Sequence, residues 1–224
     1  LGNNGVGICT SSSLPPLQWV VVCVDHPTRY AETVAIPSST AACVTMFLLR
    51  LIILRHGPPR VIISDRGRQF VADAVEELVL QCNSQFRHSF PYHPQTNGLV
   101  ERTSRTLTNM LAMYVSSDHN DWDDILQFIT YAYNTAKHET TNYSPFYLLC
   151  TGSLLSCIDT VLPFDFHSNY SVSKTLCLTE ETRRIAGLRT VALKHRSKES
   201  YDSRHQSVTH CKGDFVYLWM PQRK

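Results

Sequence analysis

The chain has 224 residues, 43% of them hydrophobic and 18% charged, so a packed core is possible and wholesale disorder is excluded. Lys and Arg number 21 against 19 for Asp and Glu, and this near balance predicts that any basic surface is local. The longest strongly apolar stretch, residues 46–54, contains Arg50 and is far shorter than the roughly 20 residues of a membrane-spanning helix. We expect no membrane partner, an intracellular location in the nucleus or cytoplasm, and a fragment of a longer polyprotein.

The eight cysteines are scattered and predict no metal or disulfide framework. No C-x-x-C pair occurs, and no set of Cys and His has the spacing of a zinc finger. We therefore expect buried free thiols in a reducing compartment.

Strands alternate with helices over the first two thirds of the chain. Two apolar runs flank the turn at residues 26–28 and predict a β-hairpin. The predicted strands cover residues 19–25, 29–36, 61–64 and 86–90. Helical spacing of apolar residues predicts helices from an N-cap in residues 37–39 to Gly57, over 70–80, from Val100 to Tyr114, and from Trp122 to Tyr133. This order predicts an α/β or α+β layered sheet.

The composition changes after about residue 165. Residues 168–212 contain nine Lys or Arg and four Asp or Glu, a surplus of five cations. An exposed helix is predicted over 172–201, and its charge fits either a solvated face or contact with phosphate. Residues 213–220 predict a strand, which needs partners further along a longer chain.

Two carboxylates occupy rigid positions in the predicted structure. Asp65 follows the strand at 61–64, and Glu101 lies in the first turn of a helix after Gly98, with thirty-five residues between them. Paired carboxylates suit Mg²⁺, which prefers hard oxygen ligands, and two such ions can catalyse phosphodiester chemistry. This spacing is weak evidence by itself, because surface carboxylates are common.

Four longer sequence words narrow the interpretation. They occur in the order SDRGRQF (64–70), YHPQTNGLVER (92–102), YAYNT (131–135) and YSPF (143–146). Together they resemble the integrase core of gypsy-type LTR retrotransposons and of retroviral integrases, from about Val6 to Gly152. The resemblance implies an RNase H-like fold with a mixed five-stranded sheet flanked by helices. It also implies metal-dependent 3′-end processing and strand transfer of element DNA into target DNA, by a homo-oligomer.

The same resemblance divides the chain into three parts. Residues 1–160 correspond to the catalytic core, 161–208 to a basic helical linker, and 209–224 to the first strand of a truncated small C-terminal β-barrel. By position, Asp65 matches the second catalytic Asp and Glu101 the catalytic Glu, both as ligands of Mg²⁺ or Mn²⁺.

Two further groups of residues are candidates for contact with DNA. His93, Gln95 and Asn97 lie in the stretch that matches the active-site loop, and they fit either contact with DNA or a polar turn and cap. Arg105 lies one turn after Glu101 and fits either an ion pair with Glu101 or contact with phosphate.

The first of the three carboxylates that the family requires is missing. The matching word is VGIC, which places Cys9 at that position. Asp25 is a poor substitute, because a hairpin turning near residue 14 would set Cys9 opposite residue 19 and Asp25 roughly 20 Å away at about 3.3 Å per residue. A thiol is largely protonated near neutral pH and its thiolate is soft, so we predict weakened binding of Mg²⁺ and impaired catalysis.

Two other functions remain open from the sequence. The chain would serve as a non-catalytic DNA-binding or assembly module if it kept the fold after losing the metal site. It would act as a generic RNase H-like nuclease if it cleaved RNA–DNA hybrids without strand transfer.

Overall fold

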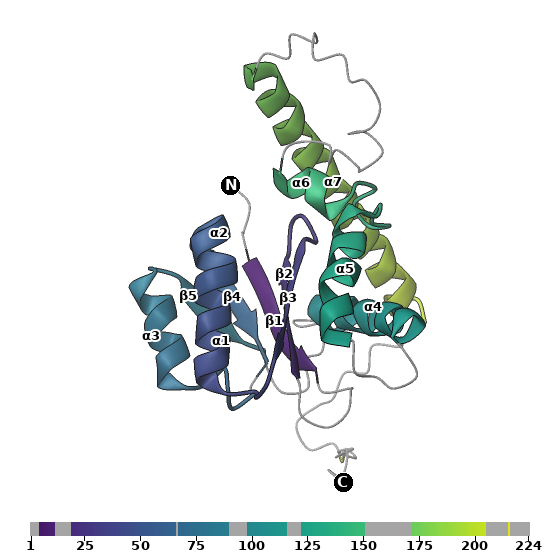
Figure 1. The fold of residues 1–224 in the computed structure, drawn as a ribbon. Helices are drawn as coiled ribbons and strands as arrows, with labels where there is room; N and C mark the ends of the chain where they lie inside the picture. The colour runs from purple at the N-terminus through teal and green to yellow at the C-terminus, as the bar shows by residue number, and fades with distance from the viewer. Residues whose placement is uncertain are drawn as a thin grey trace.

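The computed structural model describes residues 5–11, 19–65, 67–89, 98–115, 122–150, 172–204 and 215. Its centre is a five-stranded sheet in the order β3-β2-β1-β4-β5 (Figure 1). The strands are β1 (Gly5–Ser11), β2 (Trp19–Asp25), β3 (Ala31–Ile36), β4 (Val61–Ser64) and β5 (Gln85–His88). The pairs β1–β2 and β2–β3 are antiparallel, while β4 runs parallel to both β1 and β5. The predicted mixed α/β class is confirmed.

Helices cover both faces of this sheet (Figure 1). One face carries α1 (Ala41–Phe47), the π-helical segment η1 (Leu48–Ile53), α2 (Leu54–His56) and α3 (Asp73–Gln81). The other carries α4 (Gly98–Tyr114) and α5 (Trp122–Thr135). Successive residues of β2 point to opposite faces, so Val21 and Cys23 belong to the first apolar cluster, and Val22 and Val24 to the second. Burial on both faces explains the continuous apolar run of β2.

Local signals set most helix ends. The N-cap of α1 is Thr40, whose hydroxyl accepts a hydrogen bond from Cys43 N, and not the predicted residues 37–39. Gly57 ends α2 as predicted, at a φ of 81° that glycine adopts without steric cost. Helix α3 begins at Asp73 instead of residue 70, because Phe70 turns inward from the preceding turn and is completely buried.

Hydrogen bonds fasten α5 to the backbone of the edge strand β3. The buried side chain of Asn134 accepts from Ala31 N at 2.9 Å and donates to Ala31 O at 2.8 Å. Gln127 donates to Thr33 O at 3.0 Å. The Thr33 and Thr130 hydroxyls lie 2.5 Å apart. These contacts align α5 antiparallel to β3 along its length.

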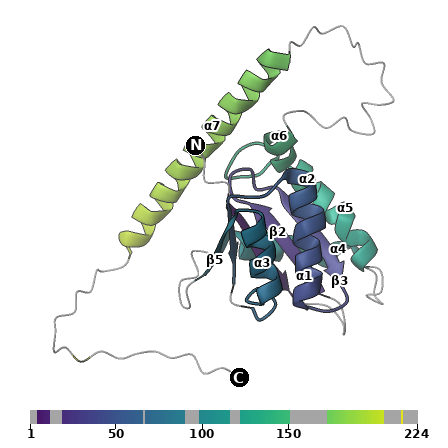
Figure 2. The same ribbon diagram turned by 90° about the vertical axis from the view of Figure 1, so that its left-hand side faces the viewer.

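Helix α7 (Val172–Asp202) is a long rod outside the layered core (Figure 2). It is fastened to α6 (Pro145–Cys150), where Arg183 donates to Leu148 O at 2.6 Å and to Leu149 O at 2.7 Å. Of its characterised side chains, only Thr179 and Ala186 are buried, which agrees with the predicted exposed helix. Most of the C-terminal strand predicted over 213–220 lies outside the described residues.

The predictions about the cysteines and about membrane-spanning helices can be compared with the structure. Of the cysteines that the structure characterises, only Cys23 is buried, whereas Cys43 and Cys82 are half-buried and Cys150 and Cys177 are exposed, so general burial was a wrong prediction. Cys43, Cys82 and Cys177 are free thiols. No helix within the described ranges is long and apolar enough to cross a membrane.

Candidate active site

Asp65 is held firmly at the end of β4. The completely buried Ser64 hydroxyl donates to Asp65 O at 2.9 Å and lies 3.3 Å from His88 Nδ1. Gly67 N donates to Asp65 Oδ1 at 2.9 Å, and no described residue bonds the second carboxylate oxygen. The carboxylate is therefore oriented by the backbone of Gly67.

The packing around Asp65 also explains why residue 67 is a glycine. A Cβ at this position would lie 3.0 Å from Asp65 Oδ1 and 2.6 Å from Gln69 Nε2, so a larger residue would disturb the carboxylate. The sequence predicts Asp65 as a site residue, but the roles of Ser64 and His88 as its supports were not predicted. A serine directly before the aspartate was the local signal, whereas the pairing of Ser64 with His88 depends on the sheet.

The backbone of β1 places position 9 beside Asp65. Ile8 pairs with Ser64 across the parallel strands, so the next positions, Cys9 and Asp65, lie side by side. Across the antiparallel pair, Cys9 lies opposite Val22 and not near residue 19, so the predicted register was wrong by three residues. The corrected register leaves Asp25 roughly 10 Å along the strand instead of 20 Å, at about 3.3 Å per residue.

Glu101 approaches from the helix layer. It is exposed in the first turn of α4, next to Val100, which is completely buried in the cluster that contains Val22 and Val24. The first turn of α4 thus covers the sheet face to which Val22, the partner of Cys9, contributes. The register thus places Cys9 beside Asp65, and Glu101 lies at the start of the helix that covers this face of the sheet.

The described side chains do not complete a metal site. No group of three or more His, Cys, Asp or Glu among them is placed to hold a metal ion. Asp65 and Glu101 supply two carboxylates. Cys9 occupies the backbone position at which the third carboxylate is missing. The residues present fit a divalent ion only in part, so no catalytic step through a metal is derived for this chain.

The predicted DNA contacts have different outcomes. Arg105 is exposed on α4, and within the described residues it forms no ion pair with Glu101, so contact with phosphate remains its open prediction. His93, Gln95 and Asn97 lie outside the described residues.

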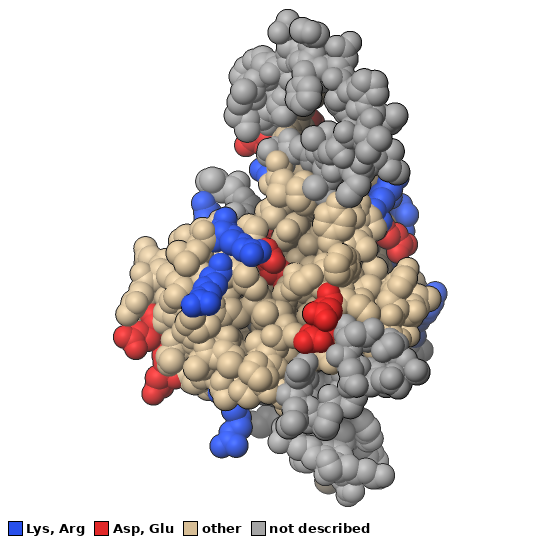
Figure 3. Space-filling model, in the orientation of Figure 1, with Lys and Arg blue, Asp and Glu red and all other residues tan. Residues whose placement is uncertain are grey.

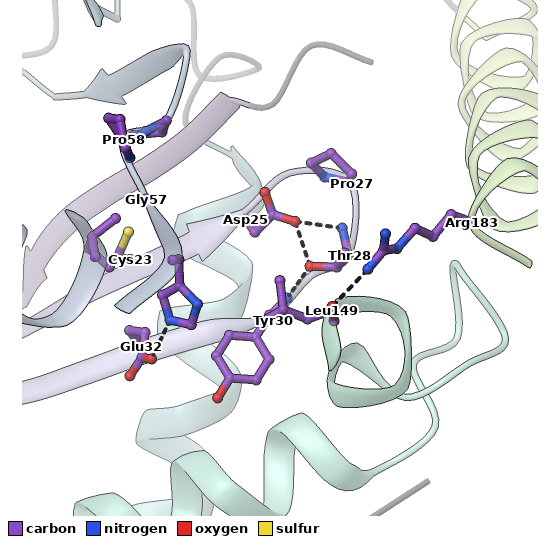
Figure 4. Close-up of a pocket in the computed structure, with 13 residues that line it drawn as sticks. Cys23, Asp25, Pro27, Thr28, Tyr30, Glu32, Gly57, Pro58, Leu149 and Arg183 are labelled. Carbon is purple, nitrogen blue, oxygen red and sulfur yellow. Dashed lines mark hydrogen bonds and ion pairs between the residues drawn. The ribbon is translucent and has the colours of Figure 1, made fainter. Parts of the chain in front are cut away.

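Asp25 belongs to a turn at the other end of β1. It pairs with Val6, and its Oδ2 accepts hydrogen bonds from Thr28 N at 3.0 Å and Thr28 Oγ1 at 2.5 Å (Figure 4). It lines a cavity of about 280 Å³ together with Cys23 and Ile52, both of which lie in the apolar cluster opposite α4. Asp25 therefore lies on the face that α4 does not cover, and it caps the β2–β3 turn.

Asp25→Ala is expected to lower stability without affecting chemistry. The substitution leaves the Thr28 N–H and hydroxyl without their acceptor, at a cost of about 1–2 kcal/mol in thermal or urea unfolding. Strand transfer, measured in a Cys9→Asp background, is expected to stay unchanged. Asp25→Asn, which keeps an acceptor oxygen, serves as the control and should retain most of the stability. Loss of strand transfer at unchanged stability would contradict this role.

Comparison with known proteins agrees with this geometry. Residues 13–94 match the integrase core domain family. The chain is 27% identical over 209 residues to the retrovirus-related Pol polyprotein from transposon 412 of Drosophila melanogaster, covering 90% of the chain and 17% of that polyprotein. It is 33% identical over 127 residues to the transposon Tf2-3 polyprotein of Schizosaccharomyces pombe, covering 56% of the chain and 10% of that polyprotein.

A solved structure supports the same assignment. The catalytic core domain of BIV integrase superposes with a TM-score of 0.56 and 25% identity, covering 66% of this chain and 95% of that one. The chain spans only 17% and 10% of the two polyproteins, so it corresponds to one segment of such proteins. The chain therefore matches the integrase core domain family over residues 13–94, is homologous to segments of retrotransposon polyproteins, and is similar in fold to a retroviral integrase catalytic core.

Proposed function

We propose that this chain is the RNase H-like core of a DNA integrase, with residues 1–160 as the core, 161–208 as a basic linker and 209–224 as the start of a C-terminal barrel. Its task would be to bind the ends of element DNA and target DNA, as a homo-oligomer. The observation that carries the proposal is the parallel register of β1 and β4, which sets position 9 beside Asp65 at the strand ends, under the helix that carries Glu101. This arrangement supports a site to which three chain segments contribute.

In this proposal Asp65 and Glu101 are the catalytic carboxylates. A divalent ion, Mg²⁺ or Mn²⁺, would supply charge stabilisation to a reacting phosphodiester, and these two residues would hold it. Cys9 replaces the hard oxygen ligand between them with a thiol, so binding of the ion is weakened and joining is slow. Restoring the carboxylate is the direct test of this proposal.

The replacement at Cys9 also favours a second function. A core that keeps its packed sheet but not its full ligand set would act as a DNA-binding or assembly partner for intact copies. Both functions predict binding to DNA, and only the first predicts joining. Cleavage of RNA–DNA hybrids without joining would favour a nuclease instead.

Binding to DNA is expected to depend on α7 more than on the core. Figure 3 shows small separate groups of acidic and basic side chains on a mostly uncharged face. On α7, by contrast, Arg189, Arg196 and Lys198 are exposed and form no ion pair with described residues. Cations free of partners are those that can replace counterions on phosphate.

Changing Arg189, Arg196 and Lys198 together to Gln is expected to weaken binding to duplex DNA by about tenfold or more in low salt. The slope of log K against log salt should fall by up to about 0.9 for each lost phosphate contact. Fluorescence anisotropy over a salt series measures both quantities. The matched control changes the exposed core residues Arg50, Arg60 and Arg87 to Gln, with the same loss of charge. Equal effects of the two triple variants would show that α7 has no special role.

A further inference from the structure

Arg29, in the turn between β2 and β3, has an unfavourable backbone conformation and an unfavourable side-chain environment. Arg29 has a φ of 70°, and the other non-glycine residues of the described chain with positive φ are Asn83 and Asn142. Asparagine is common in this left-handed region, whereas a long side chain there is unusual. Arg29 is also only 6% exposed, and its Nε has no hydrogen-bond partner. A left-handed backbone and a buried Nε without a hydrogen-bond partner at one residue point to a function.

Groups of both signs act on Arg29. Burial is the main cause that lowers the pKa of Arg29; Tyr133 and Asp25 raise this pKa, while Arg102 at the start of α4 lowers it. In the same turn, His26 Nε2 is buried without a hydrogen-bond partner, and burial followed by the charge of Arg29 lowers the pKa of His26. The nearby acid Asp25 is engaged by Thr28. No ion pair within the described part of the chain includes Arg29 or Arg102.

Packing contacts hold this turn against α4 and α5. Asn134 fixes α5 to Ala31, two residues after Arg29. The hydroxyls of Tyr133 and Thr103 lie 3.4 Å apart and join α5 to α4 directly after Arg102. Arg102 Nη1 lies 3.7 Å from the place that a Cβ on Gly98 would occupy, so the side chain folds back along the first turn of α4. Arg102 on α4 is thus close enough to the turn for its charge to act on Arg29.

We propose that Arg29, His26 and Arg102 form a binding site for one phosphate group of a DNA backbone, beside the turn of α4 that carries Glu101. A phosphate supplies both the negative charge and the hydrogen-bond acceptors that the described residues do not offer to Arg29. DNA is favoured over a small anion because Arg102 adjoins Glu101 and the exposed Arg105 follows one turn later. The inference rests on the proposed function and deepens it.

Arg29→Asn provides an unusually clear test, because stability and binding should change in opposite directions. Asparagine suits a φ of 70° and removes the buried charge, so Tm is expected to rise by about 2–4 °C. Affinity for a duplex oligonucleotide should fall about tenfold, with a decrease of about one in the salt slope. The control, Arg87→Asn on β5 at the opposite edge of the sheet, should leave both binding quantities unchanged. Inorganic phosphate is a second probe, and it should raise the Tm of the unmodified chain but not that of Arg29→Asn.

Each contrary result has a separate meaning. If the unmodified chain binds DNA and Arg29→Asn binds it equally, with the same salt slope, the phosphate site is refuted and the proposed function stands. If Arg29→Asn binds DNA equally, but inorganic phosphate raises the Tm of the unmodified chain and not that of Arg29→Asn, the site binds free phosphate. The DNA assignment is then overturned. If Arg29→Asn lowers Tm without affecting DNA affinity, Arg29 is a structural residue and the site is refuted. If the unmodified chain binds no duplex DNA even at low salt, the proposed function fails and this inference fails with it.

Discussion

Cys9→Asp is expected to raise Mg²⁺-dependent strand transfer by about 100-fold or more, because loss of one electrostatic group at a transition state costs roughly 10²–10³ in rate. The register sets position 9 beside Asp65, so an aspartate there would add a hard oxygen and a negative charge where a metal ion needs both. Joining of a labelled duplex, which carries the terminal sequence of the element, to a plasmid target measures the effect. The assay is run in Mg²⁺ and in Mn²⁺.

Two variants make the result specific to the carboxylate. Cys9→Asn has nearly the shape of aspartate without its charge and should remain at the level of the unmodified chain. Adding Glu101→Gln to Cys9→Asp should return joining to background, because the ligand set is again incomplete. Equal joining by the unmodified chain and Cys9→Asp in both metal ions would refute the impaired site. Joining that survives Glu101→Gln would refute the role of Glu101.

Asn134→Ala is expected to destabilise the fold by about 3 kcal/mol, because it leaves both the buried N–H and the C=O of Ala31 without partners, at about 1–3 kcal/mol for each group. No other described side chain hydrogen-bonds the backbone of Ala31. Urea unfolding at equilibrium gives the free energy. Asn134→Asp should also be destabilising, since it keeps the acceptor, loses the donor and buries a charge.

Gln127→Ala is the matched control for Asn134. It removes one hydrogen bond from the same helix to the same strand, but Gln127 is exposed and water can replace it at Thr33 O. A loss within about 1 kcal/mol is expected. If the two alanine variants lose the same stability, burial of the Asn134 contact does not matter and the packing argument is wrong.

Local signals in the sequence predicted the positions of strands better than they predicted how the strands pair. Strands β2 and β4 lie where the apolar runs placed them, because each run ends at a polar or turn residue. The register of β1 was misplaced by assuming a turn centred near residue 14. It depends on how Val22 packs under α4 and on the pairing of β1 with β4, and both are long-range contacts.

Only those residues of the candidate site that are marked by short stretches of sequence could be predicted. Asp65 and Glu101 follow from a strand end and a helix start, which are visible in short stretches of sequence. The burial of Arg29 was not predictable, because an arginine in a turn is ordinarily exposed and only the approach of α4 and α5 encloses it. The role of Asp25 in capping the β2–β3 turn was also not predictable, because it depends on the hydrogen bond from Thr28.

The hydrogen bonds from α5 to Ala31 and Thr33 have a consequence for self-association. They occupy the outward backbone groups of β3 at these residues, where an added strand would otherwise pair. Copies of this core therefore cannot join there by continuing the sheet from one molecule to the next unless α5 first detaches. The same contacts oppose amyloid-like growth from these residues when the core is produced in isolation.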